Sequence, residues 1–264
     1  MTELSGDNEN QYGTSKKLEA RARLQGRYTI AEIGWFQWVA QHMGLHGGET
    51  VLDIGCGPGW FWANTADQLP EGLSLTLADK SPGMVREALE RCAALGFDHI
   101  EGMEADAAAL PFADARFDIV VAMHMLYHVP DPAAAIAECF RVMRPGGRMV
   151  VTTNGAGNMP ELYALTTAFG GTPIEPVADV FGIDIAERLL RERFGNVELA
   201  VHPARMRITD KEDVFLALTS HPPGETAKAA ELADFRARIE EAFARGGGVL
   251  EAKKEMAVLV AEKG

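Results

Sequence analysis

The sequence predicts an α/β fold in which a Rossmann-like, doubly wound sheet of seven mostly parallel strands ends in one antiparallel strand. Short apolar segments with the length of buried strands alternate with segments of helical periodicity. A glycine-rich turn joins the first such strand to a helix, and the last apolar segment, 256–260, follows a long connection. Parallel strands require crossover connections, so the alternation places helices on both faces of the sheet.

Seven segments have the apolar, often β-branched character of strands. Helices are expected where apolar residues recur three or four positions apart between recognisable end signals. The Ser81-Pro82 pair is one such start, and Thr29 with Glu32 has the pattern of a capping box that predicts a helix ending at Gly44. The expected strands are 51–54, 73–78, 99–105, 117–122, 148–153, 197–201 and 256–260. The expected helices are 15–25, 29–43, 60–66, 82–95, 131–143, 158–169, 185–194, 210–218 and 227–244.

The composition argues against several classes of protein. The 264 residues carry a net charge of −13, which disfavours a nucleic-acid partner because such proteins normally present a basic surface. No apolar run reaches the roughly 20 residues of a membrane span, and residues 1–11 carry no apolar targeting signal, so we expect a cytoplasmic protein. The three cysteines are widely separated, which predicts neither disulfides nor a zinc site. The sequence leaves the oligomeric state open.

The glycine-rich turn is the strongest local signal in the chain. Gly55, Gly57 and Gly59 alternate after the strand 51–54, so the backbone can turn left-handed and a ligand can approach without meeting a Cβ atom. The turn opens a helix, whose free N–H groups attract polar or anionic groups. The spacing differs from the dinucleotide fingerprint G-x-G-x-x-G. A tight turn without any ligand is the alternative interpretation.

Polar residues follow four of the predicted strands in succession. Asp53, Asp79, Asp106 and His124 all fall at carboxyl ends, where open α/β sheets bind their ligands. Three acidic strand ends followed by a histidine are difficult to explain by solubility alone. The sequence therefore predicts a ligand site along this edge.

These residues resemble the class I S-adenosylmethionine-dependent methyltransferases, and within them the branch typified by ubiquinone and menaquinone methyltransferases, with the methyltransferase type 11 domain. The resemblance covers roughly residues 50–153. It is carried by Asp53-Ile54-Gly55-Cys56-Gly57-Pro58-Gly59, Asp79-Lys80-Ser81-Pro82, Asp106-Ala107 with Leu110-Pro111-Phe112, and Arg144-Pro145-Gly146-Gly147. It implies S-adenosyl-L-methionine as cofactor and one structural domain of three parts. These are an N-terminal helical lid segment (1–48), the cofactor-binding core (49–154), and the rest of the sheet with helical substrate-cap insertions (155–264).

The resemblance also gives the strand-end residues their expected roles. Asp79 is expected to accept hydrogen bonds from both ribose hydroxyls, with capping near Ser81 as the alternative. Asp106 is expected to bind the adenine amino group, or only to cap its loop, and Met84 to pack on the adenine or in the core. Asp53 is expected to order the loop or to reach the ligand's amino group through water. The predicted cofactor-binding set is Asp53, Gly55, Gly57, Gly59, Asp79, Lys80, Met84, Asp106, Ala107 and His124.

Catalysis and acceptor binding are expected from residues around and outside this core. Methyl transfer needs a positioned acceptor and, for some acceptors, a base. His124 is the first candidate base, with a cofactor-contacting histidine as the alternative, and Tyr127 and His128 follow one turn later. Residues without a sheet role are predicted to bind the acceptor, with core packing as the alternative for the tryptophans. They are Tyr12, Tyr28, Trp35, Trp38, Tyr163, Arg205 and Arg207.

The expected function is therefore methyl transfer to oxygen or nitrogen, less favourably carbon, of a small and partly apolar metabolite, with secondary metabolism as one setting. No metal-ligand set is evident in the sequence. Two alternatives stay open: a non-methylating S-adenosylmethionine-binding protein or cyclase, and an RNA methyltransferase. A nicotinamide oxidoreductase is disfavoured by the glycine spacing.

Overall fold

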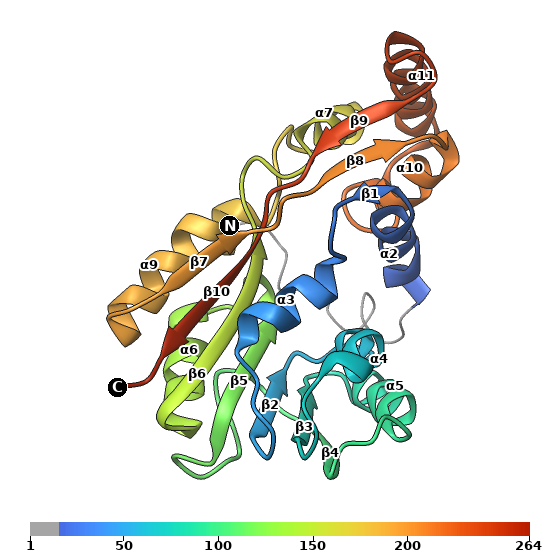
Figure 1. Ribbon diagram of the computed structural model, residues 1–264. Coiled ribbons are helices and arrows are strands. Elements are labelled where there is room, and N and C mark those ends of the chain that lie inside the picture. The colour runs from blue at the N-terminus through green and yellow to red at the C-terminus, as the bar shows by residue number, and fades with distance from the viewer. Residues whose placement is uncertain (1–15) are drawn as a thin grey trace.

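A seven-stranded sheet forms the centre of the structure, a computed structural model that describes residues 16–264 (Figure 1). From edge to edge the strands are β4 (His99–Glu104), β3 (Ser74–Asp79), β2 (Thr50–Ile54), β5 (Phe117–Met123), β6 (Met143–Asn154), β10 (Met256–Glu262) and β7 (Glu198–Val201). The predicted sheet is confirmed: the first five of these neighbours are parallel, and β10 lies antiparallel between β6 and β7. Strand order reverses between β2 and β5, so their carboxyl ends flank the switch point where such sheets bind ligands.

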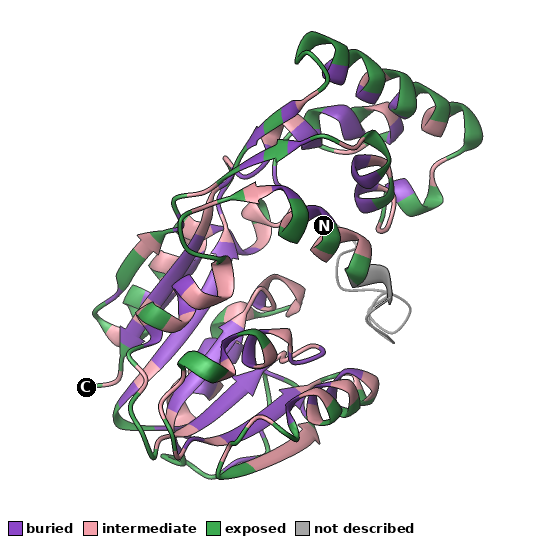
Figure 2. Cartoon of the chain, turned by 45° about the vertical axis from the view of Figure 1, so that its right-hand side comes forward, coloured by how far each residue is buried: buried purple, intermediate pink, exposed green. Residues whose placement is uncertain are grey.

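Helices cover both faces of this sheet. One face packs against α6 (Pro132–Val142), α8 (Ala178–Phe181) and α9 (Ile183–Phe194), and the other against α3 (Trp35–Met43), α4 (Trp60–Thr65) and α5 (Pro82–Cys92). Successive strand residues point to opposite faces, so Leu52 joins the first hydrophobic cluster and Val51 the second. Both are 0% exposed, and each such burial contributes roughly 1.5–3 kcal/mol. In Figure 2 the central strands are accordingly the most continuously buried part of the chain.

A second lobe stands beyond the carboxyl edge of the main sheet (Figure 1). Its antiparallel three-stranded sheet has the order β1 (Thr29–Ile30), β8 (Arg205–Ile208), β9 (Leu250–Lys253). Together with α2 (Lys16–Tyr28), α7 (Pro160–Thr166), α10 (Lys211–Leu218) and α11 (Ala229–Arg245), these strands enclose a separate hydrophobic cluster. Leu24, Leu162, Met206, Val214 and Phe235 are among its buried members.

The predicted helix from Thr29 is wrong. Thr29 and Ile30 pair instead with Met206 and Arg205, so their backbone groups enter a sheet and the capping-box pattern is not used. The helix begins only at Trp35, after Gly34, and ends as predicted at Gly44, whose φ of 62° is left-handed. The strands β8 and β9 were not predicted either. Each has four residues, too few for periodicity to separate it from a loop.

The two sheets are joined by a single two-stranded ribbon. Val201 pairs with Ala257 in the main sheet, and Arg205 pairs with Lys253 in the smaller one. The two strands therefore keep one continuous antiparallel register from the first sheet into the second. Between these pairs the backbone N–H of His202 still donates to the Met256 carbonyl at 2.8 Å. Pro203 then interrupts the hydrogen bonding because proline has no N–H. The junction lies at the carboxyl edge of the main sheet.

A buried carboxylate fastens α2 to α10. Asp213, 2% exposed, accepts a hydrogen bond from the Tyr28 hydroxyl at 2.7 Å and pairs with Arg27 at 3.2 Å and with Arg23. Three donors on one carboxylate satisfy a charge that would otherwise be costly to bury. Among the described residues no helix is long and apolar enough to cross a membrane.

Candidate active site

The glycine loop adopts the conformation that its sequence predicts. Gly55, Gly57 and Gly59 have φ values of 68°, 52° and 73°, a region that side chains disfavour. A Cβ at Gly55 would meet Met125, and one at Gly59 would meet Ala88 and Cys92. A Cβ at Gly57 would instead project into open space. Gly55 and Gly59 are therefore needed for close packing. Gly57 leaves open space beside the loop backbone, and we call this space the cradle.

The end of β3 supports this loop. The Asp79 carboxylate accepts hydrogen bonds from the N–H of Gly57 at 3.0 Å and of Ser81 at 2.9 Å. Burial raises its pKa, and these N–H groups oppose the rise. The side chain of Ser81 in turn accepts from the Met84 N–H at 3.4 Å, so the predicted cap is confirmed. Because each carboxylate oxygen can accept more than one hydrogen bond, Asp79 can hold the loop and still bind hydroxyl groups.

The other predicted adenine contacts lie beside Asp79. Lys80 and Asp106 form an exposed ion pair at 3.5 Å, and Asp106 also accepts from the Ala108 N–H at 2.9 Å. Ala107 and Met84 are buried, at 5% and 1% exposed. The structure thus brings together the residues predicted to bind the cofactor, and their individual roles stay predictions.

Asp53 is buried beneath the glycine loop. One carboxylate oxygen accepts from the Trp62 indole N–H at 2.7 Å, whereas the other, Oδ1, has no hydrogen-bond partner among the described residues. Burial, reinforced by the nearby charge of Asp79, raises the pKa of Asp53 from 3.8 to about 7. An unsatisfied buried oxygen at the switch point is free to accept from a ligand or a bridging water.

His124 follows β5 in a strained conformation. Its φ of 50° is rare for a residue with a side chain, and its N–H donates to the Thr152 carbonyl at 3.1 Å. The ring Nε2 is buried with no hydrogen-bond partner among the described residues. Burial, together with the charges of Lys254 and His128, lowers the pKa of His124 to about 3. Burial also lowers the pKa of His128, in the short helical turn Leu126–His128, to about 4. Both imidazoles are therefore neutral near pH 7.

Aromatic rings from α3 cover His124. The Trp35 ring lies 5.6 Å from that of His124 and 5.4 Å from that of His202, and it stacks on Trp38 at 5.7 Å. His202, at the ribbon junction, is 2% exposed, and its Nε2 lies 2.9 Å from the Ile33 carbonyl. Its Nδ1 has no hydrogen-bond partner among the described residues. Trp35 is thus placed beside the candidate catalytic histidine, and Trp38 stacks on Trp35 and lies 5.0 Å from the His202 ring.

A cluster of buried polar side chains continues from His124 toward the second lobe. The Glu175 carboxylate accepts from Asn154 at 3.0 Å, Asn158 at 2.7 Å and Tyr163 at 3.1 Å. Burial raises the pKa of Glu175, and the hydrogen bonds from Asn158, Tyr163 and the Val177 backbone oppose that rise, as does the charge of Lys254. Lys254 is 9% exposed and donates to the side chain of Gln25, and burial lowers its pKa to about 8. We call Asn154, Asn158, Tyr163, Glu175 and Lys254 the buried polar cluster.

Three residues predicted to bind the acceptor have other contacts. The hydroxyl of Tyr28 donates its hydrogen bond to the buried carboxylate of Asp213. Arg205 and Arg207 lie on the exposed face of β8, where both pair with Glu251 at 3.3 and 3.4 Å. Tyr12 lies outside the described residues. Tyr163, by contrast, donates to the buried Glu175 at 3.1 Å, and the Tyr127 ring lies 4.5 Å from that of His128.

Sequence reasoning missed several residues of this site. Asn154 directly follows the fifth predicted strand, so the rule that singled out the acidic strand ends would also have found it. Glu175 lies between two prolines in what reads as a loop, and Lys254 stands in a charged Lys-Lys-Glu run that reads as a solvated connection. Lys254 reaches the carboxyl edge of the main sheet only because the strands of the ribbon pair there, which the local sequence does not show.

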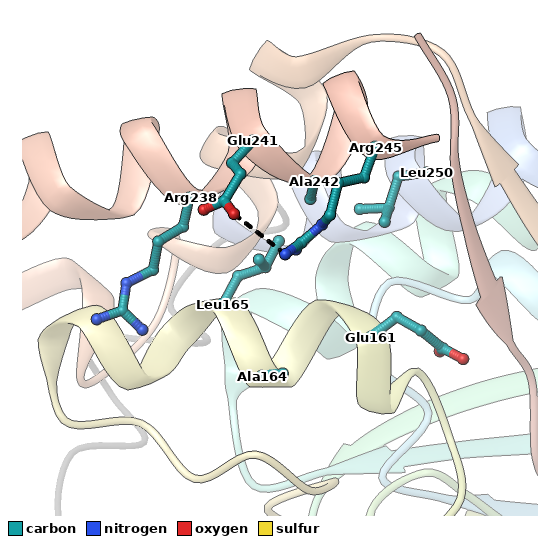
Figure 3. A pocket seen from close by; sticks show the side chains of 8 residues that line it. All are labelled: Glu161, Ala164, Leu165, Arg238, Glu241, Ala242, Arg245 and Leu250. Atoms are coloured by element: carbon teal, nitrogen blue, oxygen red, sulfur yellow. Dashed lines mark hydrogen bonds and ion pairs between the residues drawn. The ribbon is translucent and has the colours of Figure 1, made fainter. Parts of the chain in front are cut away.

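A groove of about 510 Å³ lies elsewhere, in the second lobe between α7, α11 and β9 (Figure 3). Its walls combine apolar Leu165 and Leu250 with charged side chains, among them Arg245, which pairs with Glu241 at 3.2 Å. The residues predicted to bind the cofactor take no part in it. In residues 16–264 no group of three or more His, Cys, Asp or Glu side chains is arranged to hold a metal ion.

Comparison with known proteins agrees with this geometry. Residues 52–151 match the methyltransferase domain family. The demethylmenaquinone methyltransferase of Beutenbergia cavernae is 38% identical over 144 residues, which are 54% of this chain and 57% of that protein. The ubiquinone biosynthesis O-methyltransferase of an Azoarcus species is 33% identical over 131 residues, covering 50% of this chain and 54% of that protein. The chain thus spans little more than half the length of these relatives.

A solved structure extends the likeness in fold to the whole chain. The phosphoethanolamine N-methyltransferase 2 of Haemonchus contortus, in complex with S-adenosyl-L-methionine, has a TM-score of 0.60 at 17% identity, covering 100% of this chain and 60% of that one. Domain match, relatives and sheet order agree. The chain therefore carries a methyltransferase domain over residues 52–151, and it is similar to class I S-adenosylmethionine-dependent methyltransferases of the ubiquinone and menaquinone type.

Proposed function

We propose that the chain transfers a methyl group from S-adenosylmethionine to an oxygen or nitrogen atom, less favourably to carbon, of a small and partly apolar acceptor. The observation that carries the proposal is the open cradle at Gly57, held by Asp79 and lying above Asp53. The net charge of −13 favours a small molecule over a nucleic acid as acceptor.

The residues of the site fit this cofactor. The open space at Gly57 admits a ligand against the backbone, and Asp53 Oδ1 is a buried acceptor without a partner among the described residues. Asp79 offers further acceptor capacity to ribose hydroxyls, and the Lys80–Asp106 pair borders the place expected for the adenine. When bound, S-adenosylmethionine supplies a methyl carbon activated by its sulfonium for in-line displacement.

The chain itself has then to position the acceptor, exclude water and manage a proton. Trp35, backed by Trp38, offers apolar surface beside His124 for the apolar part of the acceptor. A neutral imidazole with so low a pKa is a weak base, so we assign His124 to orienting the acceptor through Nε2. The Tyr127 ring lies next to that of His124, and the His128 ring lies next to that of Tyr127.

Calorimetric titration with S-adenosylhomocysteine and with NADH tests the cofactor. S-adenosylhomocysteine should bind, and binding of NADH alone would overturn the proposal. The variant Gly57→Ala places a Cβ in the cradle and should abolish the binding. Gly195→Ala is the matched control, because Gly195 also has a positive φ, of 80°, and open space around its missing Cβ, at the end of α9.

Release of S-adenosylhomocysteine from S-adenosylmethionine across a panel of hydroxylated and amino metabolites then tests transfer. Mass spectrometry of the product identifies the methylated atom. Cofactor binding without transfer to any compound of the panel would favour a protein that binds the cofactor without methylating.

A further inference from the structure

Lys254 is a buried cation at the junction of the two sheets. It lies two residues before β10, where the ribbon passes the carboxyl end of β6, and only 9% of it is exposed. Its backbone is fixed on both sides, because the N–H of Met159 donates to the Lys253 carbonyl at 3.0 Å and the N–H of Gly155 to the Glu255 carbonyl at 2.8 Å. The ammonium is therefore held at the carboxyl edge of the sheet.

The hydrogen-bonding capacity of this ammonium is largely unused. An ammonium group donates three hydrogen bonds, and in the described part of the chain the Gln25 side chain is its one acceptor. Glu175 is near enough for its charge to act on Lys254, but no ion pair within 4.0 Å joins the two. The Glu175 carboxylate is already occupied by Asn154, Asn158 and Tyr163.

Two buried histidine nitrogens without a partner among the described residues belong to rings within reach of the Lys254 charge. They are Nε2 of His124 and Nδ1 of His202. Asn154 Oδ1, at the end of β6, and Nε of Arg21, on α2, are buried in the same state. Buried donors and acceptors that stay unmatched among the described residues are free to bind a polar ligand.

The charges show which kind of ligand would suit it. Arg21, whose charge acts on His128 and Tyr163, adds a second cation to that of Lys254, whereas Glu175 is the one acid of the buried polar cluster. His124 and His128 are both neutral near pH 7, because burial lowers their pKa values. The Lys254 ammonium is thus buried without an ion-pair partner within 4.0 Å in residues 16–264, and a buried ammonium in that state is stabilised when an anion arrives.

We propose that Lys254 binds an oxygen anion of the acceptor, a phenolate, enolate or carboxylate, and holds it beside His124. This inference rests on the proposed function, because it assigns the acceptor end of the same site. Lys254 is then the residue that selects acidic acceptors, and Trp35 and Trp38 receive their apolar portion. The ribbon junction thereby serves acceptor recognition as well as the connection of the two sheets.

Calorimetry with matched pairs of probes tests the assignment at pH 7 in saturating S-adenosylhomocysteine. The anionic probes are 2,4-dinitrophenol and 4-nitrobenzoate, and their neutral counterparts are 2,4-dinitroanisole and 4-nitrobenzamide. The wild-type chain should bind at least one anion about 10- to 100-fold more tightly than its counterpart, the range for a hydrogen bond to a charged group. The probe that shows the preference distinguishes a phenolate site from a carboxylate site.

The variant Lys254→Met should lose this preference. Lys253→Met should keep it, because Lys253 is the adjacent residue of the same type with an exposed side chain. If Lys254→Met does not fold, judged by its thermal melt, the double variant Lys254→Met/Glu175→Gln removes both buried charges and takes its place.

Equal affinity of the wild type for anions and their neutral counterparts would overturn the inference, as would a preference that survives the loss of Lys254. S-adenosylhomocysteine binding, measured in the same samples, separates the two proposals. If it binds while the preference for anions is absent, the anion site alone is wrong. If it does not bind at all, the proposed function fails.

Discussion

The carboxylate of Asp79 accepts a hydrogen bond from the backbone N–H of Gly57 at 3.0 Å, so the end of one strand holds the loop that follows its neighbour. This contact links two motifs that lie more than twenty residues apart in the sequence. It also means that the residue expected to bind the ribose shapes the cradle for the rest of the cofactor.

Replacing Asp79 by Ala should therefore weaken cofactor binding by about 1.5–3 kcal/mol, the range for hydrogen bonds to a charged group. Titration of S-adenosylhomocysteine into the variant measures the change. Asp67→Ala, which removes an exposed carboxylate beyond α4, serves as the control. A folded Asp79→Ala variant with the affinity of the parent would remove Asp79 from the binding set.

His124→Ala should reduce turnover by about 100-fold, because the acceptor loses the group that orients it, while S-adenosylhomocysteine affinity stays nearly unchanged. Because the pKa of His124 lies at about 3, the wild-type rate should show no inflection near pH 6.5 from this imidazole. Steady-state rates between pH 5 and 8 provide the measurement. Loss of cofactor affinity with full turnover at saturation would make His124 a cofactor-binding residue instead.

The stability of the protein should depend on pH through Asp53. Its pKa is about 7 in the folded state, against the ordinary aspartate value of 3.8 in the unfolded chain, so the folded state retains a proton that the unfolded chain has lost. The resulting stabilisation is complete below pH 4 and disappears as pH rises through 7. Relative to Asp53→Asn, the wild type should lose about 3 kcal/mol of unfolding free energy between pH 5 and pH 8. Urea unfolding of both proteins at the two pH values measures it, and a constant difference would contradict the assignment.

Tyr28→Phe separates a structural role from acceptor binding. Removing the hydroxyl leaves the buried Asp213 with one donor fewer, which should lower the unfolding free energy by about 1–3 kcal/mol. Cofactor affinity and the KM for the acceptor should be unchanged in the folded variant. If stability is retained and the KM rises, Tyr28 belongs to the acceptor site as the sequence suggested.

Most of the main sheet could be predicted because its elements carry long, regular signals. The strand 117–122 is almost wholly apolar, and Ser81 and Asp131 cap their helices with the expected hydrogen bonds to Met84 and Ala134. The same strand-end rule led to Asp53, Asp79 and His124, since parallel strands bring their carboxyl ends to one edge whatever the intervening sequence.

The second lobe could not be predicted in the same way. Thr29 and Ile30 became a strand only because β8 is present to pair with them, and no pattern within two residues records a partner that lies far along the chain. Lys254 and Glu175 interact for the same reason: they are distant in sequence, and each looks like a solvated charge until the ribbon and the loop after β6 enclose them.

The continuous register of the ribbon has a consequence for how this architecture can change. The chain leaves the main sheet after Val201 and returns at Met256, on strands that already pair, so residues 205–253 form an excursion from a hairpin. An insertion, deletion or exchange within that excursion leaves the pairing of Val201 with Ala257 in place. Changes in residues 205–253 would therefore reshape the second lobe, while the glycine loop, His124 and Lys254 lie outside the excursion and keep their places.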